Sequence, residues 1–311
     1  MSSINKPLPP GFSVGQYCIE RLISDGGFSF VYLAYDDKGG PVAIKEYLPA
    51  ALALRTGSTA SPIVRDEHRM AFDRGLRCFF EESRHLVSLK HPNVVRVIDF
   101  FRANDTVYLV MEYERGRTLQ EHISRHKGQL SEGFIRRAFF SLSAGLREVH
   151  SQKLLHLDIK PANIYLRSNG EPVLLDFGAA RQTIGHDIPQ GRSMHTPGFA
   201  APEQYADDSE GKLGPWTDIY AIGATMYACL SATTLLSADR RLEKDLLRPA
   251  TEAWRGKYSK QLLEIIDRCL ALDLMARPQS VFALQRELTD LSQEKKWLRE
   301  IRSHLHKIVK K

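Results

Sequence analysis

The chain has 311 residues, of which 43% are hydrophobic and 26% are charged, an ordinary composition for a globular protein with room for two cores. Its four cysteines show neither metal-ligand nor redox spacing, which argues against a secreted disulfide scaffold and favours reduced thiols in a cytosolic compartment. The formal net charge is +6, but residues 292–311 hold seven Lys or Arg against two Glu. The basic character therefore belongs to the tail, and we expect no nucleic-acid partner.

The first residues contain no apolar core of signal-peptide length, so we expect no export and a cytoplasmic location. Residues 1–13 are predicted to be a flexible lead-in. Strands are predicted where β-branched and aromatic residues gather. These stretches are 17–24, 30–36, 42–45, 94–101 and 107–113.

Residues 49–66, rich in Ser, Thr, Gly and Pro, are loop-like and longer than a usual connection. From Phe72 to Leu89, apolar residues recur at intervals of three and four, which predicts a helix that ends before His91-Pro92-Asn93. The first part of the chain is thus predicted to be a small β structure with one main helix.

The rest of the chain is predicted to be largely helical. Ser131 and Glu132 mark the start of a long helix, and further helices are expected over residues 262–270 and 280–291. Residues 219–238 run for twenty positions without a charge, which is long enough to cross a bilayer. Their content of Ala, Gly, Ser and Thr favours a buried helix in a globular core.

The tail, residues 292–311, places apolar residues on one helical face with Lys and Arg around it. The apolar residues are Leu298, Ile301, Leu305 and Ile308. Such a tail is compatible with an anionic membrane surface, with a partner protein, or with a solvated final helix docked on the preceding domain. It is also compatible with the cytoplasmic portion of a longer, membrane-anchored protein.

Two acids, an amide and a lysine flank a predicted hairpin over residues 164–175. They are Asp158, Lys160, Asn163 and Asp176. If the two strands pair, these side chains converge on one spot. Phosphoryl transfer needs a carboxylate to orient a hydroxyl, oxygen ligands for Mg²⁺ and a cation on the moving group. Asp158 fits the first role, Asn163 and Asp176 the second, and Lys160 the third.

The run His156-Leu157-Asp158-Ile159-Lys160-Pro161-Ala162-Asn163, followed by Asp176-Phe177-Gly178, resembles the catalytic loop and the metal-binding motif of the protein kinase family. Lys45-Glu46-Tyr47-Leu48-Pro49 and Ala201-Pro202-Glu203-Gln204-Tyr205 look like bacterial eukaryotic-like (Hanks-type) serine/threonine kinases. The resemblance covers about residues 14–290. It implies an α+β, two-lobed protein kinase fold, with a small antiparallel β lobe and one main helix (14–112), a larger helical lobe (113–290) and a basic amphipathic tail (291–311).

The resemblance also implies ATP and Mg²⁺ as cofactors, with Mn²⁺ as an alternative. Lys45, in Val42-Ala43-Ile44-Lys45, would bind the phosphates and pair with Glu82, which is selected by counting back from His91-Pro92. The other implied nucleotide contacts are Ser24, Gly26, Gly27 and Phe28 of the glycine-rich loop and Met111, Glu112 and Glu114 of the hinge. Ser24 and Ser29 stand where the family has glycines, which puts tight ATP binding in doubt.

Several further residues would support the site rather than react. In the family, His156 packs against Phe177, and Asp218 braces the backbone of the catalytic loop. Arg277 would pair with Glu203, and Thr196 would contact Asp158 and Lys160. Thr183 and Ser193 are the candidates for autophosphorylation.

Leu157 stands where most regulated kinases carry an arginine that pairs with a phosphate on the activation segment. Because leucine cannot make that pair, we expect a fold that does not depend on the phosphate. The function implied is a serine/threonine protein kinase, acting on Ser and Thr hydroxyls of protein substrates and autophosphorylating. The alternative is a pseudokinase that binds nucleotide or partners without turnover. A small-molecule kinase of related fold is disfavoured by Thr196 and Ala201-Pro202-Glu203, which serve peptide docking in the family.

Overall fold

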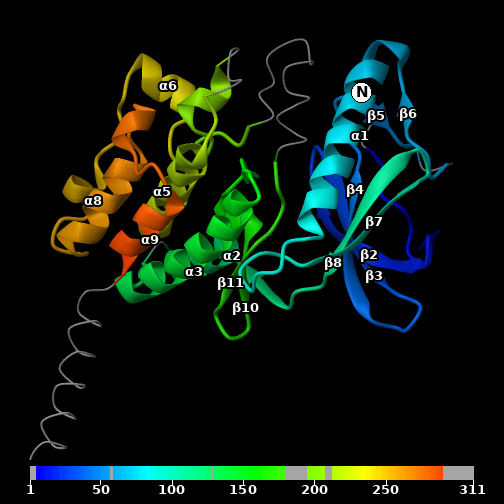
Figure 1. Cartoon of the computed structure of the whole chain (residues 1–311), viewed down its shortest axis with the longest axis horizontal. Helices are drawn as coiled ribbons and strands as arrows, with labels where there is room; N and C mark the ends of the chain where they lie inside the picture. The colour runs from blue at the N-terminus through cyan, green and yellow to red at the C-terminus, as the bar shows by residue number, and fades with distance from the viewer. Residues whose placement is uncertain (1–4, 57–58, 128, 179–194, 207–211, 290–311) are drawn as a thin grey trace, which may run out of the picture.

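The computed structural model describes residues 5–289, apart from residues 57–58, 128, 179–194 and 207–211. A β lobe and a helical lobe lie side by side in Figure 1. The β lobe is built on a six-stranded antiparallel sheet of order β1-β2-β3-β4-β8-β7. The strands are β1 (Ser13–Val14), β2 (Tyr17–Asp25), β3 (Ser29–Tyr35), β4 (Pro41–Tyr47), β7 (Val97–Ala103) and β8 (Thr106–Glu112). The predicted lobe boundary at residues 112–113 falls at the end of β8.

Helix α1 (Asp66–Leu86) covers one face of this sheet. Its buried residues Phe72 and Phe79 pack on Tyr47 of β4, with ring centroids 5.2 and 5.7 Å away. Lys45 lies two residues before Tyr47, and its Nζ is 5.7 Å from the centre of the Phe79 ring. Since side chains alternate along a strand, Lys45 and Tyr47 face α1, while Glu46 points to the opposite face.

A buried ion pair occupies that opposite face. The Arg55 guanidinium contacts both carboxylate oxygens of Glu46, at 2.6 and 2.7 Å. The hydroxyls of Tyr32 and Tyr108 donate to the same carboxylate at 2.7 and 2.8 Å. Arg55 is 1% exposed and Glu46 is fully buried, so this charge pair is stabilising only because all its polar atoms find partners.

Arg55 belongs to the predicted loop-like segment, which here contains the short hairpin of β5 (Ala53–Leu54) and β6 (Ile63–Val64). The N-terminal residues pack against this segment. Asn5 donates to the Ala53 carbonyl at 3.1 Å and accepts from the Arg55 N–H at 2.6 Å, and Leu8 is 3% exposed. Residues 5–13 are therefore held in place, unlike the predicted flexible lead-in. The loop-like segment 49–66 supplies them with backbone partners and an apolar surface.

The helical lobe is organised around α5 (Pro215–Ser231), whose residues from Thr217 to Leu230 are all buried. The predicted core helix over residues 219–238 is thus confirmed in its first part and ends earlier than predicted. Around it lie α2 (Leu119–His126), α3 (Glu132–Ser151), α6 (Ala238–Glu243), α7 (Ala250–Ala253), α8 (Lys260–Cys269) and α9 (Val281–Leu288). Within the described ranges, no helix is both long and apolar enough to cross a membrane.

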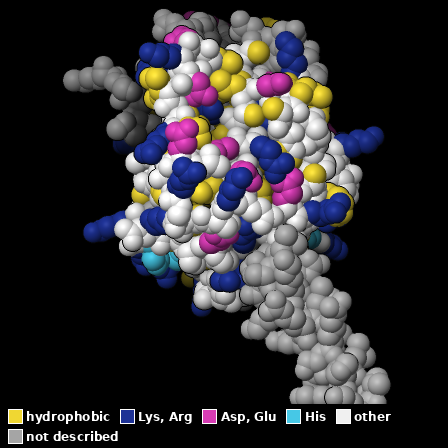
Figure 2. Space-filling model, turned by 90° about the vertical axis from the view of Figure 1, so that its left-hand side faces the viewer, with side chains coloured by type: hydrophobic (Ala, Val, Ile, Leu, Met, Phe, Trp, Pro, Cys, Tyr) yellow, Lys and Arg dark blue, Asp and Glu magenta, His cyan; other side chains and the backbone are white. Residues whose placement is uncertain are grey.

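The helical lobe also carries a three-stranded sheet of order β11-β10-β9, which faces the β lobe. Its strands are β9 (Gly116–Thr118), β10 (Ile164–Arg167) and β11 (Pro172–Leu174). On the outer face of this lobe, Lys and Arg side chains are interspersed with Asp and Glu, as Figure 2 shows.

We predict that Arg55→Met lowers the free energy of unfolding by about 3–5 kcal/mol, because it leaves the Glu46 carboxylate buried without its cation. Urea denaturation followed by circular dichroism measures this. Lys260→Met is the matched control, since Lys260 pairs with Glu264 at 3.4 Å with 86% of its side chain exposed. The control should change stability little. If the two variants lost the same free energy of unfolding, the buried pair would not contribute more to stability than the exposed one.

Candidate active site

The β10–β11 hairpin brings the predicted residues together at the end that faces the β lobe. Ile164 pairs with Leu174, and the Leu175 N–H donates to the Asn163 carbonyl at 2.8 Å. Asn163, at the end of the short helix η1 (Pro161–Asn163), and Asp176 therefore flank the same pair of strand ends. The hairpin predicted from the sequence is present, and it brings Asn163 and Asp176, which precede and follow it, to the same end.

Asp158 is the centre of a compact polar cluster. Its carboxylate accepts hydrogen bonds from Lys160 Nζ at 3.1 Å and from the Thr196 hydroxyl at 2.8 Å. Lys160 Nζ also donates to the Thr196 hydroxyl at 2.8 Å. The Asn163 amide nitrogen donates to the other carboxylate oxygen at 2.8 Å, which turns the amide oxygen toward other ligands. The structure thus gathers three side chains, those of Lys160, Asn163 and Thr196, around the Asp158 carboxylate.

Lys45 of the β lobe pairs with Asp176 of the helical lobe. Its Nζ lies 3.3 Å from Asp176 Oδ1, and its side chain is 3% exposed against 27% for Asp176. A residue of β4 and a residue after β11, which are far apart in the sequence, therefore meet as an ion pair between the lobes. Charges that meet at such low exposure are screened far less than surface pairs.

Glu82 and Met111 line the same small pocket as Lys45, Asp176 and Phe177. The pocket places Glu82 beside Lys45, but the pair between these two residues stays a prediction. Its neighbour Glu81 points elsewhere, as helix geometry requires, because its carboxylate pairs with Arg84 at 2.6 Å on the exposed side of α1.

A fully buried carboxylate holds the catalytic loop in place. Asp218, in the first turn of α5, accepts from the backbone N–H groups of His156 and Leu157 at 2.9 and 2.8 Å. It also contacts His150 Nε2 at 2.8 Å. Burial alone would raise the pKa of the Asp218 carboxyl, but these contacts hold its pKa below the ordinary value. The brace is therefore charged at neutral pH.

His156 is buried against Phe177, with ring centroids 4.6 Å apart. Its Nε2 lies 2.7 Å from the Leu175 carbonyl, which can only accept, so Nε2 carries the proton. Nδ1 then accepts from the Asp158 N–H at 3.3 Å. Burial holds the pKa of His156 below its ordinary value despite the nearby carboxylates. The ring is a neutral support and not a proton carrier.

Two residues without glycine's freedom adopt left-handed backbone angles here, Leu157 (φ 60°) and Asp176 (φ 47°). Such angles persist only where surrounding contacts impose them, and they are concentrated at functional sites. Gly178 comes close to the catalytic loop, because a Cβ at this position would lie 2.9 Å from the Asp158 Cβ. Its N–H donates to the His156 carbonyl at 2.8 Å. The two motifs are thus packed directly on each other.

The predicted glycine-rich loop is the turn between β2, which contains Ser24, and β3. Gly26 and Ser29 exchange backbone hydrogen bonds at 3.1 and 3.3 Å, and the Gly27 carbonyl accepts from the Ala50 N–H at 2.8 Å. Phe28 is buried edge-on against Tyr47. A Cβ on Gly27 would meet no atom within 4 Å. The fold itself therefore does not demand glycine at 27.

The predicted hinge residues lie where β8 ends and the chain passes to β9. Met111 is 5% exposed, and Glu112 forms an exposed pair with Arg96 at 3.4 Å. The Glu114 carboxylate pairs with Arg167 at the end of β10. Nothing in the sequence predicts this last pair, since an arginine at a strand end is usually solvated.

Glu203 and Arg277 form a buried bidentate pair, with N–O distances of 2.8 and 3.1 Å. The Thr217 hydroxyl donates to the same carboxylate at 2.8 Å, which ties the pair to α5. Thr183 and Ser193, the predicted autophosphorylation residues, lie outside the described residues, as does the tail 291–311.

The residues present fit a nucleotide with Mg²⁺. Among the described residues there is no group of three or more His, Cys, Asp or Glu that would hold a metal alone. Mg²⁺ takes one or two protein oxygens and completes its shell with phosphates and water. The Asp176 carboxylate and the Asn163 amide oxygen could supply such a partial shell, and Lys45 could supply a cation for the phosphates.

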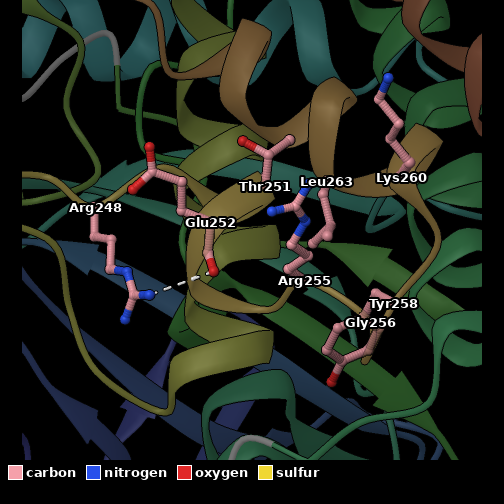
Figure 3. A pocket seen from close by; sticks show the side chains of 8 residues that line it. All are labelled: Arg248, Thr251, Glu252, Arg255, Gly256, Tyr258, Lys260 and Leu263. Carbon is pink, nitrogen blue, oxygen red and sulfur yellow. Dashed lines mark hydrogen bonds between the residues drawn. The ribbon is translucent and has the colours of Figure 1, made fainter.

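A second pocket lies in the helical lobe, away from this cluster. Figure 3 shows its lining, where the Arg248 guanidinium bonds the Glu252 carbonyl at 3.4 Å. Arg248, Arg255 and Lys260 are exposed there. Such cations are ordinary solvated surface residues, so this pocket takes no part in the site described above.

Comparison with known proteins decides the family, because the model of the protein kinase domain matches residues 17–289. The chain belongs to the protein kinase family. It is 29% identical to human serine/threonine-protein kinase Nek10 over 90% of its own length and 24% of that protein's. It is equally identical to serine/threonine-protein kinase PknD of Chlamydia pneumoniae, over 91% of this chain and 32% of that protein.

The kinase fold is confirmed by the solved structure of PpkA-294 in its apo form. The two sequences are 35% identical, and the two structures superpose with a TM-score of 0.81. The match covers 91% of this chain and 99% of that one. The resemblance to serine/threonine kinases, bacterial ones among them, is likewise confirmed. The chain spans less than a third of the length of Nek10 and PknD.

We predict that stability falls as the pH drops below about 6.5, the ordinary pKa of histidine. The pKa of His156 is lowered in the folded state, so below this pH the unfolded chain binds a proton that the folded chain does not bind. The free energy of unfolding then falls by up to about 1.4 kcal/mol per pH unit. Above this pH both states are neutral and the stability is fully present. Urea denaturation between pH 7.5 and 5.5 measures the slope.

His156→Asn should flatten that slope, and His85→Asn, at an exposed site, is the comparison. If the slope persists unchanged in His156→Asn, another group is responsible for it.

Proposed function

We propose that this chain is an ATP- and Mg²⁺-dependent serine/threonine protein kinase. The observation that carries the proposal is the ion pair at 3.3 Å between Lys45 and Asp176. It joins the phosphate-binding strand of one lobe to the metal-binding motif of the other, next to the Asp158 cluster. No structural role would require two lobes to present an ammonium, two acids and an amide to one another.

Asp158 orients the acceptor hydroxyl and accepts its proton as the hydroxyl oxygen bonds to the γ-phosphorus and the bond from that phosphorus to the bridging oxygen breaks, so that ADP leaves. Lys160, 2.9 Å from the Asp158 carboxylate, lies where it can contact the transferred group. When bound, ATP supplies that group and Mg²⁺ neutralises its charge. Lys45 holds the phosphates, with Glu82 as its partner, while Asn163 and Asp176 provide the metal ligands. Mn²⁺ would suit the same oxygen ligands.

The hinge segment would recognise adenine through the backbone of Glu112 and Glu114, with Met111 at the back of the pocket. Ser24, Gly26, Gly27 and Phe28 would cover the phosphates. Thr196, bonded to both Asp158 and Lys160, would help to seat a Ser or Thr side chain of a protein substrate. We also propose autophosphorylation, with Thr183 and Ser193 as candidate acceptors, and a membrane or partner contact for residues 292–311.

We predict that Asp158→Asn lowers incorporation of labelled phosphate into a protein acceptor by about 10²–10⁴-fold, because the amide cannot accept the proton. Asp37→Asn, an exposed loop change, is the matched control and should keep the activity. The pseudokinase alternative makes the opposite prediction, since nucleotide would bind without transfer. Wild-type protein that binds Mg-ATP yet labels no acceptor would decide for that alternative.

We predict that complete dephosphorylation leaves turnover unchanged. Leu157, whose carbonyl accepts from Gln204 Nε2 at 3.2 Å, offers no cation to an activation-segment phosphate. Phosphatase treatment followed by mass spectrometry and a rate measurement tests this. Loss of turnover that Thr183→Glu or Ser193→Glu restores would show that such a phosphate is needed after all.

A further inference from the structure

Arg167, the last residue of β10, makes contacts in two directions. Its Nε donates to Glu114 Oε2 at 2.8 Å, and its Nη2 donates to the other oxygen of the same carboxylate. Its Nη1 donates to the Pro92 carbonyl at 2.6 Å. A planar guanidinium can make this bidentate pair and a third bond at once, which an ammonium cannot.

The two partners come from different parts of the fold. Glu114 lies in the hinge between β8 and β9, and Pro92 lies in the loop after α1. That loop is also tied to β11, because Asn93 Nδ2 donates to the Pro172 carbonyl at 2.7 Å and the Leu174 N–H donates to the Asn93 carbonyl at 2.9 Å. Arg167, at the end of β10, therefore links the hinge to the loop after α1, and that loop is in turn bonded to β11.

The hinge is also pressed against β10 at this point. Gly116 pairs with Arg167 in the β9–β10 ladder, and a Cβ on Gly116 would lie 2.0 Å from the Leu166 carbonyl oxygen. The backbone from Glu114 to Gly116 thus has little room to shift while the pair is made. Asn163 immediately precedes this same short strand, so the strand connects the hinge at one end to the metal ligand at the other.

Burial distinguishes this pair from a surface ion pair. The Arg167 and Glu114 side chains are 27% and 15% exposed. The neighbouring hinge acid, Glu112, pairs with Arg96 at 3.4 Å with exposures of 47% and 62%. The first pair is bidentate and partly shielded, whereas the second is single and screened by solvent. The chain thus supplies its own comparison within the hinge.

We propose that Arg167 is a positioning residue for the nucleotide. Through its pair with the Glu114 carboxylate, it holds the hinge backbone in the position that binding of adenine would require. The inference rests on the proposed function, in which the Glu114 backbone contacts adenine. Arg167 itself touches neither adenine nor the phosphates. Its contribution is preorganisation, since a hinge that is already ordered loses less freedom when the nucleotide binds.

The test is a calorimetric titration with Mg-ADP, combined with steady-state kinetics in ATP. Arg167→Gln and Glu114→Gln should each weaken Mg-ADP binding about tenfold, as expected for losing a charge-assisted contact, while Arg96→Gln should bind like the wild type. The double variant should bind no more weakly than either single variant, because both remove one pair. The KM for ATP should rise while kcat at saturating ATP is kept, since uniform binding is lost.

A second measurement does not depend on nucleotide. Amide hydrogen exchange of peptides covering residues 112–117 should be faster in Arg167→Gln than in Arg96→Gln, at matched stability. Wild-type affinity in Arg167→Gln, or unchanged exchange of the hinge, would overturn the inference and leave the proposed function standing. A wild-type protein that fails to bind Mg-ADP would overturn the proposed function, and the exchange experiment would then decide alone whether Arg167 orders the hinge.

Discussion

The buried carboxylate of Asp218 is the constraint on which the active site depends. A charge that is fully buried is costly unless donors surround it, and here the donors are the backbone of the catalytic loop itself and His150. Satisfying Asp218 therefore fixes the loop to α5, the most buried helix of the larger lobe. His156, held by the same carboxylate, then stacks on Phe177 and binds the Leu175 carbonyl. One acid thus sets the position of both motifs.

This constraint also explains how strained backbone is retained. Leu157 and Asp176 both have left-handed angles, which branched or bulky side chains avoid. Leu157 keeps its angle because its N–H is bonded to Asp218 and its carbonyl to Gln204. Gly178, bonded to His156 and packed against Asp158, fixes the residue next but one to Asp176. The strain lies where Asp158 and Asp176 must face one common point.

The sequence predicts the parts of this protein that depend on local pattern. The β strands, the main helix and the hairpin after Asn163 follow from periodicity and turn residues, and the order of motifs identifies the fold. The long-range charge pairs of Arg55 and Arg167 could not be predicted, whereas the pair of Glu203 with Arg277 followed from the family resemblance. Arg55 and Arg167 have the same appearance in sequence as solvated surface arginines, and only the fold shows that Glu46 and Glu114 face them. The order of the N-terminal segment could not be predicted from its own residues, because its partners belong to the loop-like segment 49–66, which contains Arg55.

These two arginines lie next to residues to which we assign roles in the proposed phosphoryl transfer. Glu46, the partner of Arg55, is adjacent to Lys45 on β4, and Arg167 ends the strand that follows Asn163. The pair in the β lobe is sealed from water, so it fixes β4 within one rigid body. The pair at the hinge is partly exposed, and the same guanidinium joins the helical lobe to the β lobe through its bond to the Pro92 carbonyl. The charge pair inside the β lobe is thus closed to solvent, whereas the contacts of Arg167 at the hinge are partly accessible to it. In the kinase that we propose, such accessible contacts would let the lobes shift as a nucleotide enters and leaves.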